Sequence, residues 1–338
     1  MIIVTGGAGF IGNNLLRELN RQCETDILVV DDLASEASAE ASAAKFLNLV
    51  GAQFADYMDK SEFRAAIRNN SLPASRISAI FHQGACSNTL ETDGRFMMDN
   101  NFTYSKELLE FALAHRIPFV YASSAAVYGL SENFTERPEN ERPLNIYGFS
   151  KLAFDNYVRR RVSPSDSTVV GLRYFNIYGP REFHKGPMAS VISRFAAQLK
   201  ETGVIRMFQG CGKYGDGEQR RDFVFVRDVV NVNLFFGRGP SRHSIVNVGT
   251  GQSRTFNEVA AALMHLHAAG RVQYIPLPPE VRDKYQPFTQ ADISSLRWAG
   301  YVAPFTELSQ GIRETFAEPS ANSQRPVDRP ALTASQTR

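Results

Sequence analysis

The N-terminal stretch constrains the fold of this chain more than any other part. Residues 2–4 are a short β-branched run, glycines follow at positions 6, 7, 9 and 12, and the leucines at 15, 16 and 19 have the spacing of one helix face. This order predicts a strand, a tight turn and a helix. The glycines at 7, 9 and 12 match the dinucleotide fingerprint, in which missing side chains let backbone amides approach a pyrophosphate at the helix N-terminus. We therefore expect a bound dinucleotide, with Gly6, Gly9 and Gly12 among its contacts.

A second apolar run, residues 27–30, ends at Asp31 and Asp32, about 20 residues after the glycines. An acidic side chain at this place binds the ribose hydroxyls of a dinucleotide. The combination of a glycine turn with this acid favours dinucleotide binding over an ordinary turn. Because a carboxylate repels a 2′-phosphate, Asp31 by itself favours NAD over NADP.

Apolar, β-rich runs recur at 27–30, 79–82, 118–122 and 168–174, and helical stretches separate them. Strands that alternate with helices pair in parallel, which predicts an α/β fold with a doubly wound, Rossmann-type sheet and a ligand site at the carboxyl ends of its strands. Beyond about residue 180 the pattern changes to loops rich in glycine, proline and arginine, with helical segments near 190–202 and 257–268. We expect a smaller, mixed α/β substrate domain there.

These patterns divide the chain into segments. We expect a dinucleotide-binding domain over 1–175, to which a strand and a helix at about 221–245 return, and a substrate domain built from 176–220 and 246–316. The composition of 317–338, rich in Pro, Ser, Gln and Arg, predicts a disordered tail. The alanine- and serine-rich residues 35–44 predict a surface insertion.

The composition argues against several classes of protein. A net charge of +2 over 338 residues gives no argument for nucleic-acid binding, and no apolar run reaches the length of a membrane span. The three cysteines are too few and too scattered for a disulfide framework or a zinc site, and the six histidines lack metal-binding spacing. The N-terminal run lacks the basic region and cleavage site of a secretory signal. We therefore expect a cytoplasmic protein without a metal, a nucleic-acid partner or a membrane partner.

A tyrosine and a lysine four residues apart, Tyr147 and Lys151, indicate proton transfer. On a helix this spacing makes the phenol and the ammonium neighbours. Lowering the pKa of a tyrosine from about 10 to neutrality requires roughly 4 kcal/mol of preferential stabilisation of the phenolate, and a lysine charge supplies part of it. Because the same spacing is common on solvated helix faces, the pair gains meaning only from its context.

Two serine hydroxyls that precede the tyrosine and the lysine in the sequence supply the first part of this context. The predicted strand at 118–122 is followed by Ser123 and Ser124, which can hydrogen-bond a substrate oxygen. The glycine loop, serines, tyrosine and lysine in this order resemble the extended short-chain dehydrogenase/reductase superfamily, over nearly the whole chain to about residue 316. Dehydratases of that superfamily carry Thr-Asp-Glu after the strand, whereas this chain has Ser123, Ser124 and Ala125. Elimination is therefore disfavoured, which leaves epimerisation or simple oxidation.

Further segments resemble one family within it, the ADP-L-glycero-D-manno-heptose 6-epimerases. They are 55–60 (ADYMDK), 84–87 (GACS), 97–101 (MMDNN), 173–182 (RYFNIYGPRE), 184–186 (HKG), 221–224 (RDFV) and 288–292 (FTQAD). The resemblance implies an NADP-dependent isomerase that inverts C6 of an ADP-heptose destined for the lipopolysaccharide inner core. In the implied cycle C6 is oxidised, the ketone presents its other face, and the same hydride returns. The resemblance also implies a homo-oligomer, a pentamer.

The resemblance assigns the acid and base steps to Tyr147 and Lys185, because oxidation and reduction occur on opposite faces of the same carbon. Taken alone, Lys185 is more typical of a solvated basic turn or a phosphate contact, and only the matching motif around it favours catalysis. Lys151 then holds the ribose and tunes Tyr147, while Ser123 or Ser124 donates to the reacting oxygen. Which of Tyr147 and Lys185 serves which epimer stays open.

For the cofactor, the resemblance implies NADP although Asp31 favours NAD, because lysines from elsewhere offset the repulsion. The matching lysines are Lys45 and Lys60, and Asp32 stands where the family commonly has Asn. We expect NADP, with NAD as the alternative. The further cofactor contacts that the resemblance implies are Phe10, Ile11, Gln83 (Glu in the family), Gly84, Ala85, Cys86, Ser87, Asn100, Lys151, Ile177 and Lys185.

For the substrate, the positions that match the family are Asn176, Pro187, Arg194, Phe208, Gln209, Gly210, Cys211, Arg221 and Tyr285. A guanidinium at Arg221 can fork onto a diphosphate, although an ion pair with a neighbouring acid is the ordinary alternative. Pro187 and Arg194 replace the family's Ser and His, and residues 212–219 form a longer loop. The nucleotide end of the site is therefore the least constrained part.

Other functions fit parts of the same pattern. A nucleotide-sugar epimerase that acts at another carbon, such as C4, needs the same acid and base groups, and a net reductase needs most of them. A non-catalytic NADP-binding sensor needs the fold but has no need of Tyr147.

Overall fold

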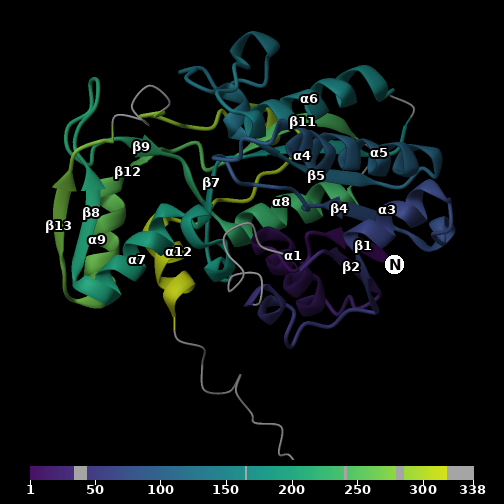
Figure 1. Cartoon of the computed structure of the whole chain (residues 1–338), viewed down its shortest axis with the longest axis horizontal. Coiled ribbons are helices and arrows are strands. Elements are labelled where there is room, and N and C mark those ends of the chain that lie inside the picture. The colour runs from purple at the N-terminus through teal and green to yellow at the C-terminus, as the bar shows by residue number, and fades with distance from the viewer. Residues whose placement is uncertain (34–43, 164–165, 240–241, 279–284, 318–338) are drawn as a thin grey trace, which may run out of the picture.

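A seven-stranded parallel sheet forms the centre of the molecule (Figure 1). The computed structural model describes residues 1–33, 44–163, 166–239, 242–278 and 285–317. The sheet order is β11-β6-β5-β4-β1-β2-β3, and every neighbouring pair is parallel. The strands are β1 (Ile2–Thr5), β2 (Ile27–Asp31), β3 (Asp56–Asp59), β4 (Ala79–His82), β5 (Phe119–Ser124), β6 (Val169–Tyr174) and β11 (His243–Val248). The predicted α/β, doubly wound Rossmann-type fold is confirmed.

Helices cover both faces of this sheet. On one face α1 (Phe10–Arg21) packs beside α8 (Val226–Arg238), and on the other lie α3 (Lys60–Arg68), α5 (Tyr104–Ala114) and α6 (Ile146–Arg161) (Figure 1). Strand residues alternate between the two cores: Val4 packs with α1 and α8, whereas Ile3 packs with α3, α5 and α6. Burial on both faces explains why these strands are continuous apolar runs in the sequence.

The order of the strands along the sheet reverses at β1, and this reversal determines where a ligand site is expected. β1 pairs with β2 on one side and with β4 on the other. In open α/β sheets, ligands bind in the crevice outside the carboxyl ends of the strands at such a point. The loops after β1 and β4 meet there, because a Cβ placed on Gly6 would lie 2.7 Å from the Gly84 nitrogen.

A third core lies beyond the sheet, at the left of Figure 1. The helices α7 (Val191–Thr202), α9 (Phe256–His267) and α12 (Leu308–Phe316) surround it with the parallel strands β8 (Val204–Phe208) and β13 (Arg271–Ile275). Two short pairs join β7 (Asn176–Tyr178) to β10 (Phe223–Phe225) and β9 (Arg220–Arg221) to β12 (Arg254–Thr255). The smaller region is thus mixed α/β.

The segment predicted to return to the sheet, 221–245, contains β10, α8 and the start of β11, which extends the edge beside β6. The segment that rejoins the sheet ends at Val248, a few residues beyond the predicted end at about 245. The division of the chain into two domains remains a prediction. Short elements complete the described chain: α4 (Gly94–Met98), α11 (Ser294–Trp298), η1 (Phe46–Asn48), η2 (Ala74–Arg76), η3 (Asp99–Thr103), η4 (Ala125–Tyr128), η5 (Pro138–Asn140) and η6 (Phe183–Met188). The predicted insertion at 35–44 and tail at 317–338 lie almost entirely outside the described residues.

Candidate active site

A cavity of about 940 Å³ runs from the carboxyl ends of β1, β4 and β5 to the third core. Its size suits a cofactor and a small-molecule ligand. The predicted site residues that line it are Gly6, Gly9, Phe10, Ile11, Gly12, Asp31, Asp32, Lys45, Lys60, Gln83, Gly84, Ala85, Ser87, Asn100, Ser123, Ser124, Tyr147, Lys151, Asn176, Ile177, Lys185, Arg194, Phe208, Arg221 and Tyr285. Cys86, Pro187, Gln209, Gly210 and Cys211 are not part of its lining.

The glycine loop leaves no room for side chains. A Cβ on Gly12 would lie 2.1 Å from the Gly6 carbonyl oxygen, far inside van der Waals contact, and Gly6 itself has a φ of +67°. Gly9 is the N-cap of α1 and has no side chain that could accept a hydrogen bond from the amides of the first helical turn. Such a cradle fits a pyrophosphate, which would take up the unsatisfied amides and the positive end of the helix dipole.

Four charged side chains balance one another at the end of β2. The Lys45 ammonium lies 2.7 Å from Asp31 and 3.5 Å from Asp32, and the Lys60 ammonium lies 2.6 Å from Asp32. Lys60 also donates to the Asn100 side-chain oxygen at 3.1 Å. Asp31 accepts the Ala8 backbone N–H at 2.9 Å, so this acid is tied to the glycine loop. Two ammonium groups therefore flank the acid predicted to bind ribose.

A buried hydrogen-bond chain supports the loops beneath this site and was not predicted. The Ser105 hydroxyl donates to the Asn101 carbonyl (2.6 Å) and accepts from His82 Nε2 (2.8 Å), so His82 Nδ1 accepts from the Thr5 hydroxyl (2.7 Å). Thr5 in turn accepts the Gly84 N–H at 3.1 Å. Burial, and the positive charge of Lys151, lower the pKa of His82 to about 3, which is consistent with this neutral tautomer. Only the strand order brings these residues together.

Asn101, in the π-helical turn η3, links the cofactor loop to α6. Its side chain accepts the Cys86 N–H at 2.8 Å and donates to the Cys86 carbonyl (2.9 Å) and to the Ser150 hydroxyl (3.1 Å), while Ser150 donates to the Tyr147 carbonyl (2.7 Å). The Cys86 side chain is completely buried. Cys86 therefore lies beneath the cavity with its backbone held by Asn101, and its predicted contact with the cofactor stays a prediction. π-turns are frequent at functional sites, but a sequence gives little signal for them.

The tyrosine and the lysine do share one face at the start of α6. The Asn145 side chain caps this helix by accepting the Gly148 N–H at 2.8 Å. Lys151 is 5% exposed and donates to the Ala122 carbonyl at 2.9 Å. Burial lowers the pKa of Lys151 to about 8, and the nearby Asp155 carboxylate opposes that shift. Lys151 is thus anchored at the end of β5 beside Tyr147.

The two serines, which the sequence leaves equivalent, differ in the fold. The Ser123 hydroxyl donates to Asp155 at 3.0 Å, and its residue is 2% exposed. The Ser124 oxygen accepts the Ala126 N–H at 3.1 Å, which leaves its own proton able to donate into the cavity. Of the two serines, Ser124 is therefore the one whose proton is not already donated to Asp155.

Lys185 reaches the same cavity from η6, a segment distant in sequence. Its ammonium lies 5.5 Å from the centroid of the Phe10 ring. Beside it, burial and the charges of Lys45 and Lys185 lower the pKa of His184 to about 4, so this imidazole is neutral at pH 7. Pro187 is exposed outside the cavity, because Gly186 turns the backbone at a φ of +49°.

The far end of the cavity carries guanidinium groups and aromatic rings. The Arg221 guanidinium lies 5.6 Å from the Phe256 ring and 5.4 Å from the Tyr285 ring, and it donates to the Arg220 carbonyl at 2.9 Å. No carboxylate of the described residues lies within ion-pair distance of it, so the predicted alternative of an ordinary ion pair does not hold there. Burial lowers the pKa of Arg221. A planar cation held between rings suits a diphosphate.

At this end of the cavity some predicted residues lie outside the lining, and some residues that were not predicted belong to it. Gln209, Gly210 and Cys211 follow β8 outside the lining, because the chain turns back there and the Gly210 N–H bonds the Asp216 side chain at 2.7 Å. Gln198 and Arg206 do line the cavity although they were not predicted. Phe208 packs edge-to-face on Tyr285, with ring centroids 5.9 Å apart. Alternation along β8, which places Arg206 and Phe208 on one face, is the signal that could have identified Arg206.

Metal and membrane sites were sought over the described ranges. No group of three or more potential metal ligands occurs among these residues. None of the helices within them combines the length and the apolar character that crossing a membrane requires.

Comparison with known proteins places this architecture in a family. The model of the NAD dependent epimerase/dehydratase family matches residues 2–249. The ADP-L-glycero-D-manno-heptose-6-epimerase of Alkalilimnicola ehrlichii is 52% identical over 313 residues, which cover 93% of this chain and 95% of that protein. Among solved structures, the ADP-L-glycero-D-manno-heptose-6-epimerase of Helicobacter pylori has a TM-score of 0.80 at 32% identity, covering 93% of this chain and 94% of that one.

A UDP-N-acetylglucosamine 4-epimerase from Methanobrevibacter ruminantium has a TM-score of 0.77 at 26% identity, covering 93% and 96% of the two chains. The fold is thus common to epimerases that act at different carbons, whereas the higher identities belong to the heptose enzymes. This chain belongs to the NAD dependent epimerase/dehydratase family and, within it, to the ADP-L-glycero-D-manno-heptose-6-epimerases.

Proposed function

We propose that this chain interconverts ADP-D-glycero-D-manno-heptose and ADP-L-glycero-D-manno-heptose by transient oxidation at C6, as a step toward the lipopolysaccharide inner core. The observation that carries the proposal is that Tyr147 and Lys185 line one cavity with the glycine loop, although they come from elements far apart in sequence. An inversion needs proton transfer on two faces of one carbon, and two such groups supply it. The names of the relatives support the choice of sugar.

The chain's own groups divide the work as follows. The glycine loop, Asp31 and Lys151 would hold a nicotinamide dinucleotide, which would supply the hydride acceptor and donor for C6. Tyr147 exchanges the proton of the C6 oxygen on one face, with Ser124 donating to the same oxygen and Lys151 favouring the phenolate. Lys185 exchanges the proton on the opposite face. Arg221 and Arg194 bind the diphosphate, which keeps the nucleotide in place while the ketone turns.

The proposal includes NADP as the cofactor. Lys45 and Lys60 flank Asp31 and Asp32 at the ribose position, and their charges offset the repulsion between these acids and a 2′-phosphate. A cytoplasmic location and a homo-oligomeric, pentameric state belong to the same proposal. The free thiols of Cys23, Cys86 and Cys211 support a reducing compartment.

The test is an epimerisation assay with no added nicotinamide. Purified protein that retains its cofactor should convert either ADP-heptose epimer into the mixture without any net change in nicotinamide absorbance. A parallel assay with UDP-glucose and UDP-galactose should show no turnover. A requirement for stoichiometric NADPH would contradict epimerisation, and turnover of the UDP-hexoses alone would reassign the chain to C4 chemistry.

A further inference from the structure

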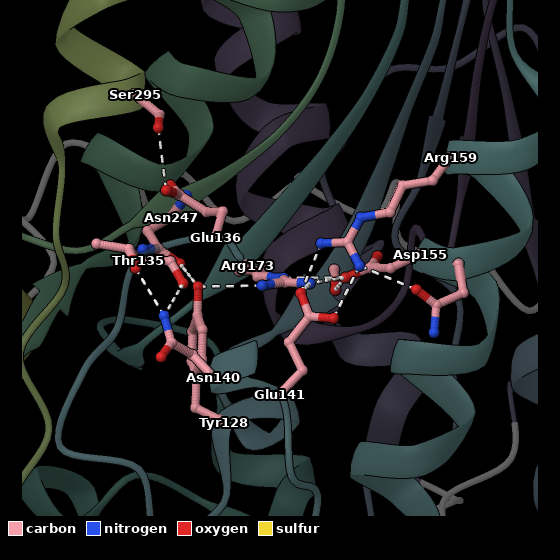
Figure 2. Close-up of polar contacts among 12 residues, drawn as sticks. Tyr128, Thr135, Glu136, Asn140, Glu141, Asp155, Arg159, Arg173, Asn247 and Ser295 are labelled. Atoms are coloured by element: carbon pink, nitrogen blue, oxygen red, sulfur yellow. Dashed lines mark hydrogen bonds and ion pairs between the residues drawn. The ribbon is translucent and has the colours of Figure 1, made fainter. Parts of the chain in front are cut away.

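A network of charged side chains joins α6 to β6 and to the loop before α6 (Figure 2). Its centre is Arg173 on β6, which is 0% exposed and donates to Asp155 through Nε (3.0 Å) and Nη2 (2.8 Å). Arg173 also pairs with Glu141, which binds Arg159 in turn. Two arginines and two carboxylates thus form a continuous chain of ion pairs between β6, α6 and the loop before α6.

Asp155 is the member of this network that contacts Ser123, a residue that lines the cavity. It follows Tyr147 and Lys151 at steps of four residues on α6, which places all three on one side of the helix. Its carboxylate accepts the Ser123 hydroxyl (3.0 Å) and the Tyr121 hydroxyl (3.0 Å) from β5. Ser123 and Arg173 are directly opposite each other in the register of β5 and β6. The two strands and the helix therefore meet at one carboxylate.

The charges around Asp155 do not cancel. Lys151, Arg159 and Arg173 are cations, whereas Glu141 and Asp155 are the anions. Removing the Asp155 charge would leave three buried or half-buried cations facing one carboxylate, and that carboxylate is held by the two arginines. Lys151 would then lose the opposite charge on its own helix face.

We propose that Asp155 is a positioning residue of this active site, which keeps Lys151 protonated and holds Ser123 so that Ser124 faces the substrate. Arg173 fixes the Asp155 carboxylate and so acts on Lys151 through it. The inference rests on the proposed function only for the role of Lys151 in turnover, because the protonation of Lys151 can be measured without substrate.

The other groups that face Lys151 come from β4 and the loop after it. Burial lowers the pKa of His82 to about 3, so the imidazole adds no positive charge near neutral pH. The Cys86 thiol is the second group that opposes the lowered pKa of Lys151, after Asp155. A Cys86→Ser background therefore separates any contribution of a thiolate from that of Asp155.

The first measurement is the titration of Lys151 in the full chain without cofactor. Acetic anhydride reacts with neutral amines, so labelling of the Lys151 peptide as a function of pH, read by mass spectrometry, gives the midpoint. Asp155→Asn should lower this midpoint by about 1 unit or more, because an adjacent opposite charge shifts a pKa by about that amount. The same shift should appear in the Cys86→Ser background.

Glu141→Gln is the matched control. It removes the other buried carboxylate of Arg173 and so weakens the same ion-pair network, but Glu141 pairs with Arg159 and Arg173, and Lys151 instead donates to the Ala122 carbonyl. The Lys151 midpoint should stay in place in this variant. An unchanged midpoint in Asp155→Asn, or an equal shift in Glu141→Gln, would overturn the proposal.

Breaking a buried ion pair from one side can unfold a protein, so a second variant is needed. Asp155→Asn combined with Arg173→Gln removes both charges and leaves Glu141 paired with Arg159. Its Lys151 midpoint should also fall, and no fall would refute the inference. In turnover assays, the activity of Asp155→Asn should decline at a lower pH than that of the native chain as the pH is raised, because Lys151 loses its proton earlier. A shifted midpoint without epimerase activity in the native chain would contradict the proposed function and leave this inference standing.

Discussion

Replacing Lys60 tests the choice of cofactor most directly. Lys60 is the first residue of α3, where a positive charge opposes the helix dipole, and its side chain is 29% exposed. The local structure therefore does not depend on it. Asp59 caps the helix, and Asp32, which is 33% exposed, retains Lys45 at 3.5 Å. Lys60→Ala should leave folding unaffected while removing one of the two ammonium groups that flank the ribose acids.

The expected size follows from the contacts of Lys60. A hydrogen bond between charged groups contributes about 1.5–3 kcal/mol, which corresponds to roughly 10- to 150-fold in affinity. Without a phosphate, Lys60 already bonds Asp32 at 2.6 Å and Asn100 at 3.1 Å, so binding a phosphate gives up part of these contacts. The lower end of the range applies. Lys60→Ala should weaken NADP binding about 10-fold and NAD binding by no more than about twofold.

The assay is calorimetric titration of the cofactor-free chain with NADP and with NAD at fixed salt concentration. Arg68→Ala is the control, since it removes a cation from the other end of α3, where Arg68 pairs with Glu107. This variant should not change the ratio of the two affinities. If Lys60→Ala weakened both dinucleotides by the same factor, the 2′-phosphate would not be bound there, and the proposal of NADP would fail.

Two further substitutions test the acid–base assignment and the glycine cradle. Tyr147→Phe removes one hydroxyl from the half-buried ring, so it should lower the turnover number by about 10² to 10⁴. Its dinucleotide affinity should stay within about twofold in the titration above, and unchanged turnover would exclude a proton-transfer role. Gly12→Ala places a methyl group 2.1 Å from the Gly6 carbonyl oxygen, so the loop has to open. This variant should lose at least about 10-fold in affinity for NADP and NAD alike, because the pyrophosphate contacts are common to both; full retention of binding would contradict the proposed cradle.

Much of the fold could be predicted because its signals are local. The apolar runs of β1 and β2, the glycine spacing and the leucines of α1 each lie within one segment, and all three describe what the structure contains. The pairing of Tyr147 with Lys151 on α6 is equally local, because helix geometry brings residues four apart to one face. The smaller region was harder to divide, since its strands pair over long separations, as β8 does with β13.

The candidate site shows where local patterns stop being informative. Ser123 and Ser124 have the same chemistry and adjacent positions. Only the hydrogen bond from Ser123 to Asp155 shows which of the two hydroxyls has already donated its proton. Cys86 lies in a matching motif but is buried, because Asn101 holds its backbone from another helix. Arg206 lines the cavity although it belongs to no recognised motif, and only its alternation with Phe208 along β8 indicates it.

The sequence by itself determined that this chain folds as a doubly wound α/β protein and carries both the glycine pattern of a dinucleotide site and a tyrosine–lysine pair. Steric limits at glycine and the periods of helix and strand act over a few residues, so they can be read directly from the order of the side chains. Only the tertiary structure decided that the Arg173 guanidinium of β6 and the Ser123 hydroxyl of β5 both bind the Asp155 carboxylate of α6. Those contacts depend on strand order and burial, which set the distance and the dielectric between charges far apart in the chain.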